Sequence, residues 1–195
     1  MLRTALLAAA AVLALHTIAF ADDAAVQAKA QSYAQTEIKK WVADPDIVAA
    51  INAANTERAG YDQGKIDALD KQWKGEVGAA SHPLIDSIAA NPSSAKLKAI
   101  CDGKGGLVTE AFLMDAKGLN VGMCDATSDF WQGDEAKWQK TFQVGPDAVF
   151  VDKVEQDEST QKFQVQTSMT VVDPATGKPI GAITVGLDAD MLTAQ

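Results

Sequence analysis

The sequence changes character near residue 106, and this change constrains the fold more than any other feature. Before it, helix-forming Ala, Lys, Gln and Glu dominate, whereas after it short runs of β-branched and aromatic residues alternate with turn formers. We expect five strands in the second part, over residues 107–115, 119–125, 148–154, 162–173 and 179–188. Helices followed by strands in this way are typical of an α+β fold.

Two short connections indicate how the predicted strands pair. Asp115-Ala116-Lys117-Gly118 and the segment 173–179 each place a Gly where the backbone must take an unusual angle. Connections this short join neighbouring antiparallel strands. The sheet is therefore predicted to be largely antiparallel.

The first part of the chain is predicted to form a long amphipathic helix and several shorter ones. Between residues 24 and 43, apolar side chains recur close to the helical period, at Val26, Tyr33, Ile38, Trp41 and Val42. Pro45 suits the first turn of a helix, so Asp44 is predicted to cap a second helix that ends before Gly60. Further helical segments are expected over 65–77, 84–90 and 94–101. The apolar stripe of the first helix fits either dimerisation or packing on its own sheet.

Residues 1–21 have the features of a secretory signal peptide. Arg3 is followed by an apolar run from Ala5 to Leu15 and then by Ala19-Phe20-Ala21, a pattern that signal peptidase cleaves. The run is shorter than the roughly 20 residues of a membrane-spanning helix. We therefore expect export across a bacterial-type inner membrane, cleavage of the signal peptide, and a mature protein in the periplasm.

The net charge of the chain bears on whether it binds nucleic acid. The chain has 26 acidic and 17 basic residues, with a formal net charge of −9. The basic residues form no cluster, and contacts to phosphates depend on concentrated positive charge. Nucleic acid is therefore not expected as a partner.

Cys101 and Cys124 are the only two cysteines of the chain. An exported protein folds in an oxidising compartment, where disulfides form and persist. A disulfide between them is the favoured prediction, and two buried free thiols are the alternative.

The predicted strand 162–173 alternates between two kinds of side chain. One set consists of Phe163, Val165, Thr167, Met169 and Val171, and the other of Gln164, Gln166, Ser168, Thr170 and Val172. The first set is predicted to face the core. The second fits either a surface in contact with solvent or the lining of a ligand cavity.

An aromatic-rich segment follows the second predicted strand. Residues 133–143 are predicted to form a short helix over the sheet, because two aromatic side chains lie four residues apart. Asp129, Phe130, Trp131 and Trp138 suit recognition of a small ligand: aromatic walls exclude water and attract cations, and a carboxylate pairs with an amine. The alternative is that Phe130 and Trp138 belong to the core and Asp129 caps the helix.

Two segments resemble Cache sensor domains. Thr127-Ser128-Asp129-Phe130-Trp131-Gln132-Gly133-Asp134-Glu135-Ala136-Lys137-Trp138 is similar to their Ser-Asp-aromatic to Trp segment. The stretch from Pro174 through Ile180-Gly181-Ala182-Ile183 to Asp188 is similar to their last hairpin. In this order and spacing the similarity covers roughly residues 30–193.

The resemblance implies a PAS-like, five-stranded antiparallel sheet with a long N-terminal helix and helices packed on it. It also implies a small metabolite bound between the sheet and the loop after the second strand. We expect a signal peptide over 1–21, a helical region over 22–105 and a sheet region over 106–195, the last two forming one compact domain. Cache domains are sensor parts of chemoreceptors and histidine kinases, so the resemblance implies a membrane-bound kinase or chemoreceptor as partner. No membrane-spanning segment follows Asp188, which indicates a free-standing periplasmic single-Cache type.

One position departs from the Cache pattern. In the amino-acid-binding branch of the family an Arg lies two residues before the Trp, where this chain has Ala136. A methyl group cannot replace a guanidinium that holds a carboxylate through two hydrogen bonds. The ligand is therefore expected to be a small carboxylate or amine rather than an amino acid. The adjacent Lys137 is expected to point elsewhere.

The predicted ligand-binding residues come from the strands, the aromatic segment and the end of the last strand. They are Phe112, Met114, Ser128, Asp129, Phe130, Trp131, Trp138, Phe150 and Asp188. For the strand residues Phe112, Met114 and Phe150 the alternative is a place in the core. For Asp188 it is a cap on the terminal turn 189–192.

No arrangement of residues predicts catalysis, a cofactor or a metal site. His82 is the only histidine after the signal peptide, and it precedes Pro83 in a predicted loop. The sequence has no nucleophile elbow, Cys/His pairing, zinc motif or phosphate-binding glycine loop. The predicted function is a non-catalytic sensor module that binds a small molecule. The alternative is an interaction or scaffold subunit without a ligand.

Overall fold

A five-stranded antiparallel sheet organises the structure. The computed structural model describes residues 23–156 and 162–194, so the predicted signal peptide, residues 1–21, lies outside the described residues. The strands are β1 (Val108–Asp115), β2 (Asn120–Met123), β3 (Val149–Gln156), β4 (Phe163–Asp173) and β5 (Lys178–Asp188). They lie in the order β2-β1-β5-β4-β3, and every neighbouring pair is antiparallel. The predicted strands, their pairing and the α+β fold class are thus confirmed.

The two predicted glycine turns connect the hairpins as expected. Gly118 between β1 and β2 has φ +81°, and Gly177 between β4 and β5 has φ +68°. Residues with a Cβ rarely adopt such angles, which explains why glycine stands at both turns. These two turns set the registers of the β1–β2 and β4–β5 hairpins.

The helices precede and flank the sheet. Residues 23–42 form one continuous helix that includes the π-helical turn η1 (Ala34–Ile38) and α2 (Lys39–Val42). The others are α3 (Pro45–Glu57), α4 (Gln63–Glu76), α5 (Pro83–Ala89), α6 (Pro92–Gly103), α7 (Ala136–Gln139) and α8 (Ala189–Thr193). The Asp44 carboxylate accepts a hydrogen bond from Asp46 N–H at 2.9 Å, which confirms its predicted capping role. Within the described ranges, no helix has the length and apolar character needed to cross a membrane.

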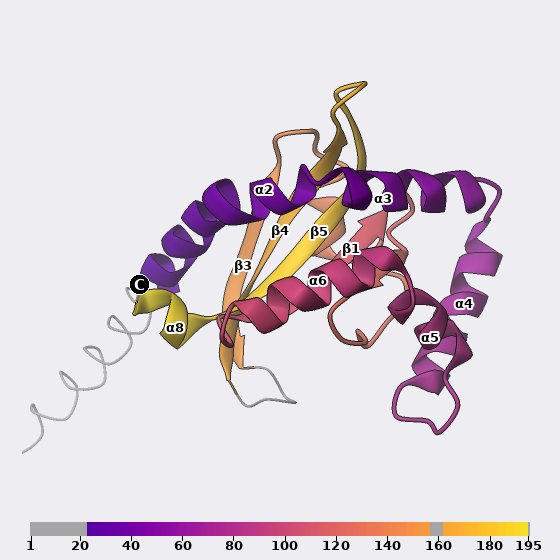
Figure 1. The fold of residues 1–195 in the computed structure, drawn as a ribbon, viewed down its shortest axis with the longest axis horizontal. Helices are drawn as coiled ribbons and strands as arrows, with labels where there is room; N and C mark the ends of the chain where they lie inside the picture. Colours follow the sequence, from indigo (N-terminus) through magenta and orange to yellow (C-terminus); the bar gives the residue numbers. More distant parts are fainter. Residues whose placement is uncertain (1–22, 157–161, 195) are drawn as a thin grey trace, which may run out of the picture.

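One face of the sheet, here called the helix face, is covered by the N-terminal helix, α3 and α6 (Figure 1). Its strand side chains are apolar and buried: Ala111, Leu113, Val165, Met169, Val171, Ile183, Val185 and Leu187. The apolar stripe of the N-terminal helix packs against them, with Ala30, Ala34 and Ile38 fully buried. The stripe therefore contributes to the core of its own domain.

The opposite face, here called the cleft face, is covered at only one end. There Phe112, Met114 and Ala182 of the strands pack with Trp73, Phe130 and Trp138 in a second apolar cluster. α4 and α5 lie to one side of the sheet, beyond the end of α3 (Figure 1). The remainder of the cleft face carries polar side chains and forms the candidate site.

The helix over this face is shorter than the predicted span 133–143. α7 comprises only Ala136–Gln139, and turns follow it. The Thr141 hydroxyl donates to the carbonyl of Lys137 at 2.6 Å, so a side chain takes an acceptor that a longer helix would use. Trp138 and Phe142 still stack, with ring centroids 5.1 Å apart.

The predicted disulfide between Cys101 and Cys124 is present. Cys101 lies near the end of α6 and Cys124 directly follows β2. The bond thus ties the helix-face layer to the chain segment that begins at Asp125.

Candidate functional site

A cleft of about 760 Å³ opens on the polar part of the cleft face. We call it the polar cleft. Its walls come from β1, β3, β4, the loop after β2 and the start of α7. The described residues that line it are Thr109, Glu110, Asp125, Ala126, Thr127, Ser128, Glu135, Ala136, Lys137, Asp152, Lys153, Glu155, Gln156, Gln164 and Gln166. None of these is aromatic.

The floor of the polar cleft is a row across three strands. Glu110 of β1 and Gln166 of β4 both pair with Gly186 of the central strand β5. Across this glycine, Gln166 Nε2 donates to Glu110 Oε1 at 2.7 Å. A Cβ at position 186 would lie 2.6 Å from Glu110 Cγ. Glycine is therefore required here for the two side chains to meet.

Neighbouring side chains order the floor further. Gln164 Nε2 donates to the same Glu110 oxygen at 3.4 Å. Gln164 Oε1 in turn accepts from the Thr109 hydroxyl at 2.7 Å. The strand alternation that the sequence displayed thus has two outcomes, since Gln164 and Gln166 line the cleft while Ser168 and Thr170 are buried.

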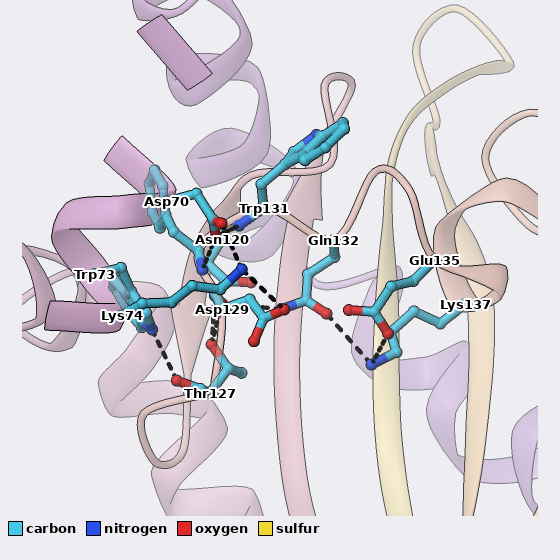
Figure 2. Close-up of polar contacts among 11 residues, drawn as sticks. Asp70, Trp73, Lys74, Asn120, Thr127, Asp129, Trp131, Gln132, Glu135 and Lys137 are labelled. Carbon is cyan, nitrogen blue, oxygen red and sulfur yellow. Dashed lines mark hydrogen bonds and ion pairs between the residues drawn. The ribbon is translucent and has the colours of Figure 1, made fainter. Parts of the chain in front are cut away.

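Lys137 belongs to the cleft wall, so the prediction that it points elsewhere is wrong. Its ammonium lies 2.9 Å from Glu135 Oε2 and donates to Gln132 Oε1 at 3.3 Å (Figure 2). It also lies 5.5 Å from the ring centroid of Phe112. Because α7 has a single turn, the side chain near its start folds back over the preceding loop instead of following a longer helix.

The loop that forms another wall of the polar cleft is held by α4 (Figure 2). Asp70 Oδ1 accepts hydrogen bonds from the backbone N–H groups of Phe130 and Trp131, both at 3.0 Å. Trp73 Nε1 donates to the Thr127 carbonyl at 2.7 Å. Two α4 side chains therefore fix the loop at Thr127 and at Phe130 and Trp131.

The Lys74 ammonium lies between Asp70 of α4 and Asp129 of the loop. Lys74 Nζ lies 2.7 Å from Asp70 Oδ2 and 3.7 Å from Asp129 Oδ2. The hydrogen bond to Asp70 raises the pKa of Lys74 above its usual value. Lys74 therefore stays charged and holds both carboxylates.

A buried ion pair lies behind the loop. Arg58 Nη1 donates to Asp115 Oδ2 at 2.9 Å and to the Asn120 carbonyl at 3.0 Å. Asp115 Oδ1 accepts from the backbone N–H groups of Lys117 and Leu119 in the β1–β2 turn. Asn120 Nδ2 donates to the Thr127 hydroxyl at 2.6 Å, which continues the network to the cleft wall.

Four of the predicted ligand-binding residues belong to the apolar core. Phe112, Met114, Phe130 and Trp138 are buried in the second apolar cluster. Phe130 stacks on Trp73 with centroids 5.2 Å apart, and Trp138 Nε1 donates to the Asp115 carbonyl at 3.1 Å. Their aromatic bulk covers one end of the sheet and so defines where the open part begins.

The other five predicted residues are spread over several places. Ser128 lines the polar cleft. Asp129 pairs with Lys74. The Trp131 ring is directed away from Thr127 and Asp129 (Figure 2), and its Nε1 donates to the Lys117 carbonyl at 2.9 Å. The Phe150 ring lies beneath the Lys140 ammonium, 4.3 Å from its centroid.

Asp188 caps the last helix, as its alternative interpretation held. Asp188 Oδ1 accepts from Met191 N–H at 3.0 Å, and Oδ2 lies 3.0 Å from Lys162 Nζ. Burial raises the pKa of Asp188, but the hydrogen bonds from Met191 N–H and Lys162 together lower it below its usual value. The carboxylate is therefore charged and engaged at the end of β5.

Sequence reasoning missed Glu110, the acidic residue of the floor. A signal was present, because Glu110 is two residues before Phe112 and so shares its face of the strand. Asp152, Lys153 and Glu155 of β3 were also missed. A bulge in the β3–β4 pairing between Val151 and Val154 breaks the alternation there, so a period of two does not reveal which side chains face the cleft.

Comparisons with known proteins found distant structural likenesses only. No family model and no curated protein matches the chain. Among solved structures, it is similar to the ligand-binding domain of the Pseudomonas aeruginosa amino-acid chemoreceptor PctC in complex with GABA. The identity is 14% and the TM-score is 0.42, and the match covers 92% of this chain and 62% of that chain. It is also similar to a Campylobacter jejuni chemoreceptor ligand-binding domain in complex with L-valine, with 15% identity, a TM-score of 0.41, and 85% and 65% covered.

A third likeness is to an extracellular domain assigned to a histidine kinase, with 12% identity, a TM-score of 0.43, and 85% of this chain and 61% of that chain covered. This chain thus spans less than two thirds of the length of these domains. The first two are ligand-binding domains of chemoreceptors, and the third is an extracellular domain. At this distance, nothing about ligand or mechanism is transferred from them to this chain.

Proposed function

We propose that this chain is a non-catalytic sensor module that binds a small molecule in the polar cleft, outside the cytoplasm, and passes the state of the cleft to a partner protein. The observation that carries the proposal is the polar cleft itself. Its volume of about 760 Å³ lies within the range of small-molecule sites, about 300–1,000 Å³. Its floor is ordered by hydrogen bonds between side chains of different strands.

The contacts between the cleft wall and α4 supply a route for the signal. Thr127 and Ser128 line the cleft, and the Thr127 carbonyl accepts from Trp73. A ligand that contacts these loop residues would alter the hydrogen bonds that Asp70 and Trp73 make with the loop. A partner that contacts the helical layer would then distinguish the occupied from the empty state.

The disulfide supports a location outside the cytoplasm. Cys101 and Cys124 are bonded, and such bonds persist in oxidising compartments. This agrees with the signal peptide predicted over residues 1–21. The proposal further places the partner in the membrane, as a kinase or chemoreceptor.

A ligand screen with a matched pair of cleft variants tests the proposal. The full chain is expressed with its N-terminal segment and purified from the periplasm, and its intact mass shows whether residues 1–21 have been removed. Thermal unfolding is then followed with a panel of small carboxylates, amines and amino acids. A compound that binds only the native state raises the melting temperature.

The variant Ala136→Trp places a bulky side chain in the cleft wall, whereas Ala175→Trp places the same side chain in the exposed β4–β5 turn. We expect a compound that stabilises the wild type and Ala175→Trp but not Ala136→Trp. Silence across the panel, or an equal shift in all three proteins, would contradict the proposal.

A further inference from the structure

The walls of the polar cleft carry an excess of negative charge. Its described lining residues include five carboxylates and two lysines, a formal charge of −3. Each lysine lies against a glutamate of the same wall: Lys137 Nζ is 2.9 Å from Glu135, and Lys153 Nζ is 2.7 Å from Glu155. A concave surface lined by one sign of charge concentrates counter-ions of the opposite sign.

The carboxylate of Glu110 lies in the floor of the polar cleft. Gln166 and Gln164 direct their amide nitrogens at it, at 2.7 and 3.4 Å, across Gly186. These donors are thus engaged within the floor. An ionised carboxylate only accepts hydrogen bonds, so a ligand group that meets it must donate, and an ammonium donates with the strongest charge assistance.

The same cleft offers little to an anion. Arg58 is the only arginine among the described residues, and it is buried on Asp115, outside the lining of the polar cleft. Ala136 contributes only a methyl group to the wall. An anionic ligand would therefore have to displace a glutamate from a lysine against the net charge of the cleft.

We infer that the ligand of the polar cleft is a small organic amine, such as an aliphatic diamine or polyamine, with an ammonium group bound by Glu110. The inference rests on the proposed function, because it specifies the ligand of the same cleft. The Glu110 carboxylate and the negative charge of the lining select a cation, and the cleft volume limits the ligand to a small molecule.

Calorimetric titration separates charge from size, with three four-carbon compounds of matched length and one longer amine, spermidine. The probes are 1,4-diaminobutane and spermidine as cations, succinate as the anion and 1,4-butanediol as the neutral compound. We expect heat of binding for one or both amines, none for the other two, and weaker amine binding at higher ionic strength.

The isosteric variant Glu110→Gln removes the charge, and Glu57→Gln makes the same change at an exposed position near the end of α3. We expect amine binding to weaken by about tenfold or more in Glu110→Gln, since a charge-assisted hydrogen bond is lost, and to be unchanged in Glu57→Gln. Circular dichroism spectra and melting temperatures show whether both variants keep the fold.

The outcomes separate the inference from the proposed function. Binding of succinate or butanediol in place of the amines overturns the cationic ligand. Amine binding that Glu110→Gln leaves intact overturns the role of Glu110. In both cases the ligand-binding cleft stands. If neither amine binds but another compound stabilises the protein, and Ala136→Trp abolishes that stabilisation, the cationic ligand is overturned while the ligand-binding cleft stands. Failure of every compound in both experiments overturns the function itself.

Discussion

The two faces of the sheet use the same strands for opposite purposes. On the helix face, Val165, Ile183 and Leu187 are fully buried beneath helices along the sheet. On the cleft face, the same strands bury Met114 and Ala182 at one end but present Glu110 and Gln166 at the other. The cleft therefore lies where the second apolar cluster stops covering this face and polar side chains of the strands begin.

This comparison predicts that stability resides on the helix face and recognition on the cleft face. Leu187→Ala would remove a fully buried side chain from the helix face. We expect it to lower the free energy of unfolding by about 4 kcal/mol, from lost burial and the cavity left behind. Urea unfolding followed by circular dichroism measures this change.

The matched variant on the cleft face is Gln166→Ala, with an expected loss below about 1 kcal/mol because its side chain is only half-buried. The same variant should weaken ligand binding, since it releases Glu110. A loss of stability equal to that of Leu187→Ala would remove the distinction between the faces.

The disulfide connects the two layers, and its removal has the next largest expected effect. Replacing both Cys101 and Cys124 by Ser opens a loop closed over a sequence separation of 23. By the loop-entropy estimate this costs about 3 kcal/mol. Urea unfolding of the double variant, compared with the wild type under oxidising and reducing conditions, gives the value.

A reducing agent should lower the stability of the wild type to that of the double variant and leave the variant itself unchanged. Because Cys124 precedes Asp125 of the cleft wall, faster amide hydrogen exchange in residues 125–128 is expected as well. Unchanged exchange there would show that α4 alone holds the loop.

The sequence predicts the sheet better than it predicts the site, for a physical reason. Strand positions and hairpins follow from local signals, such as β-branched alternation and the turn glycines Gly118 and Gly177. The helix boundary at Asp44 is likewise local. By contrast, the length of α7 depends on Thr141 competing for a carbonyl, which the period of the aromatic residues does not reveal.

The site depends on registers between strands that are far apart in the chain. Glu110 becomes part of a floor only because Gly186 lies opposite it and Gln166 lies beyond. Aromatic residues such as Phe130 and Trp138 suit a cavity wall and a core equally in sequence, and their partners Trp73 and Asp115 place them in the core. Only tertiary pairing distinguishes these cases.

The smallest expected effect concerns Asp188, the last residue of β5, which pairs with Gln164 of the cleft face. Asn also caps helices, so Asp188→Asn keeps the cap and removes the ion pair with Lys162. We expect a loss of about 1 kcal/mol or less at pH 7, since Lys162 is half-exposed. The measurement is the free energy of unfolding in urea at pH 7 and pH 3.

The contribution of Asp188 to the free energy of unfolding should depend on pH. The pKa of Asp188 is lower in the folded protein than its usual value. Its stabilisation is therefore fully present above the unfolded pKa, about 4, and is lost as the pH falls through the lower folded pKa. The wild type and Asp188→Asn should accordingly converge in stability as the solution becomes acidic, whereas Asp147→Asn, in an exposed turn, should follow the wild type throughout. A difference between Asp188→Asn and the wild type that is equal at both pH values would assign its effect to packing, and the charge on this part of the cleft face would then contribute nothing to the fold.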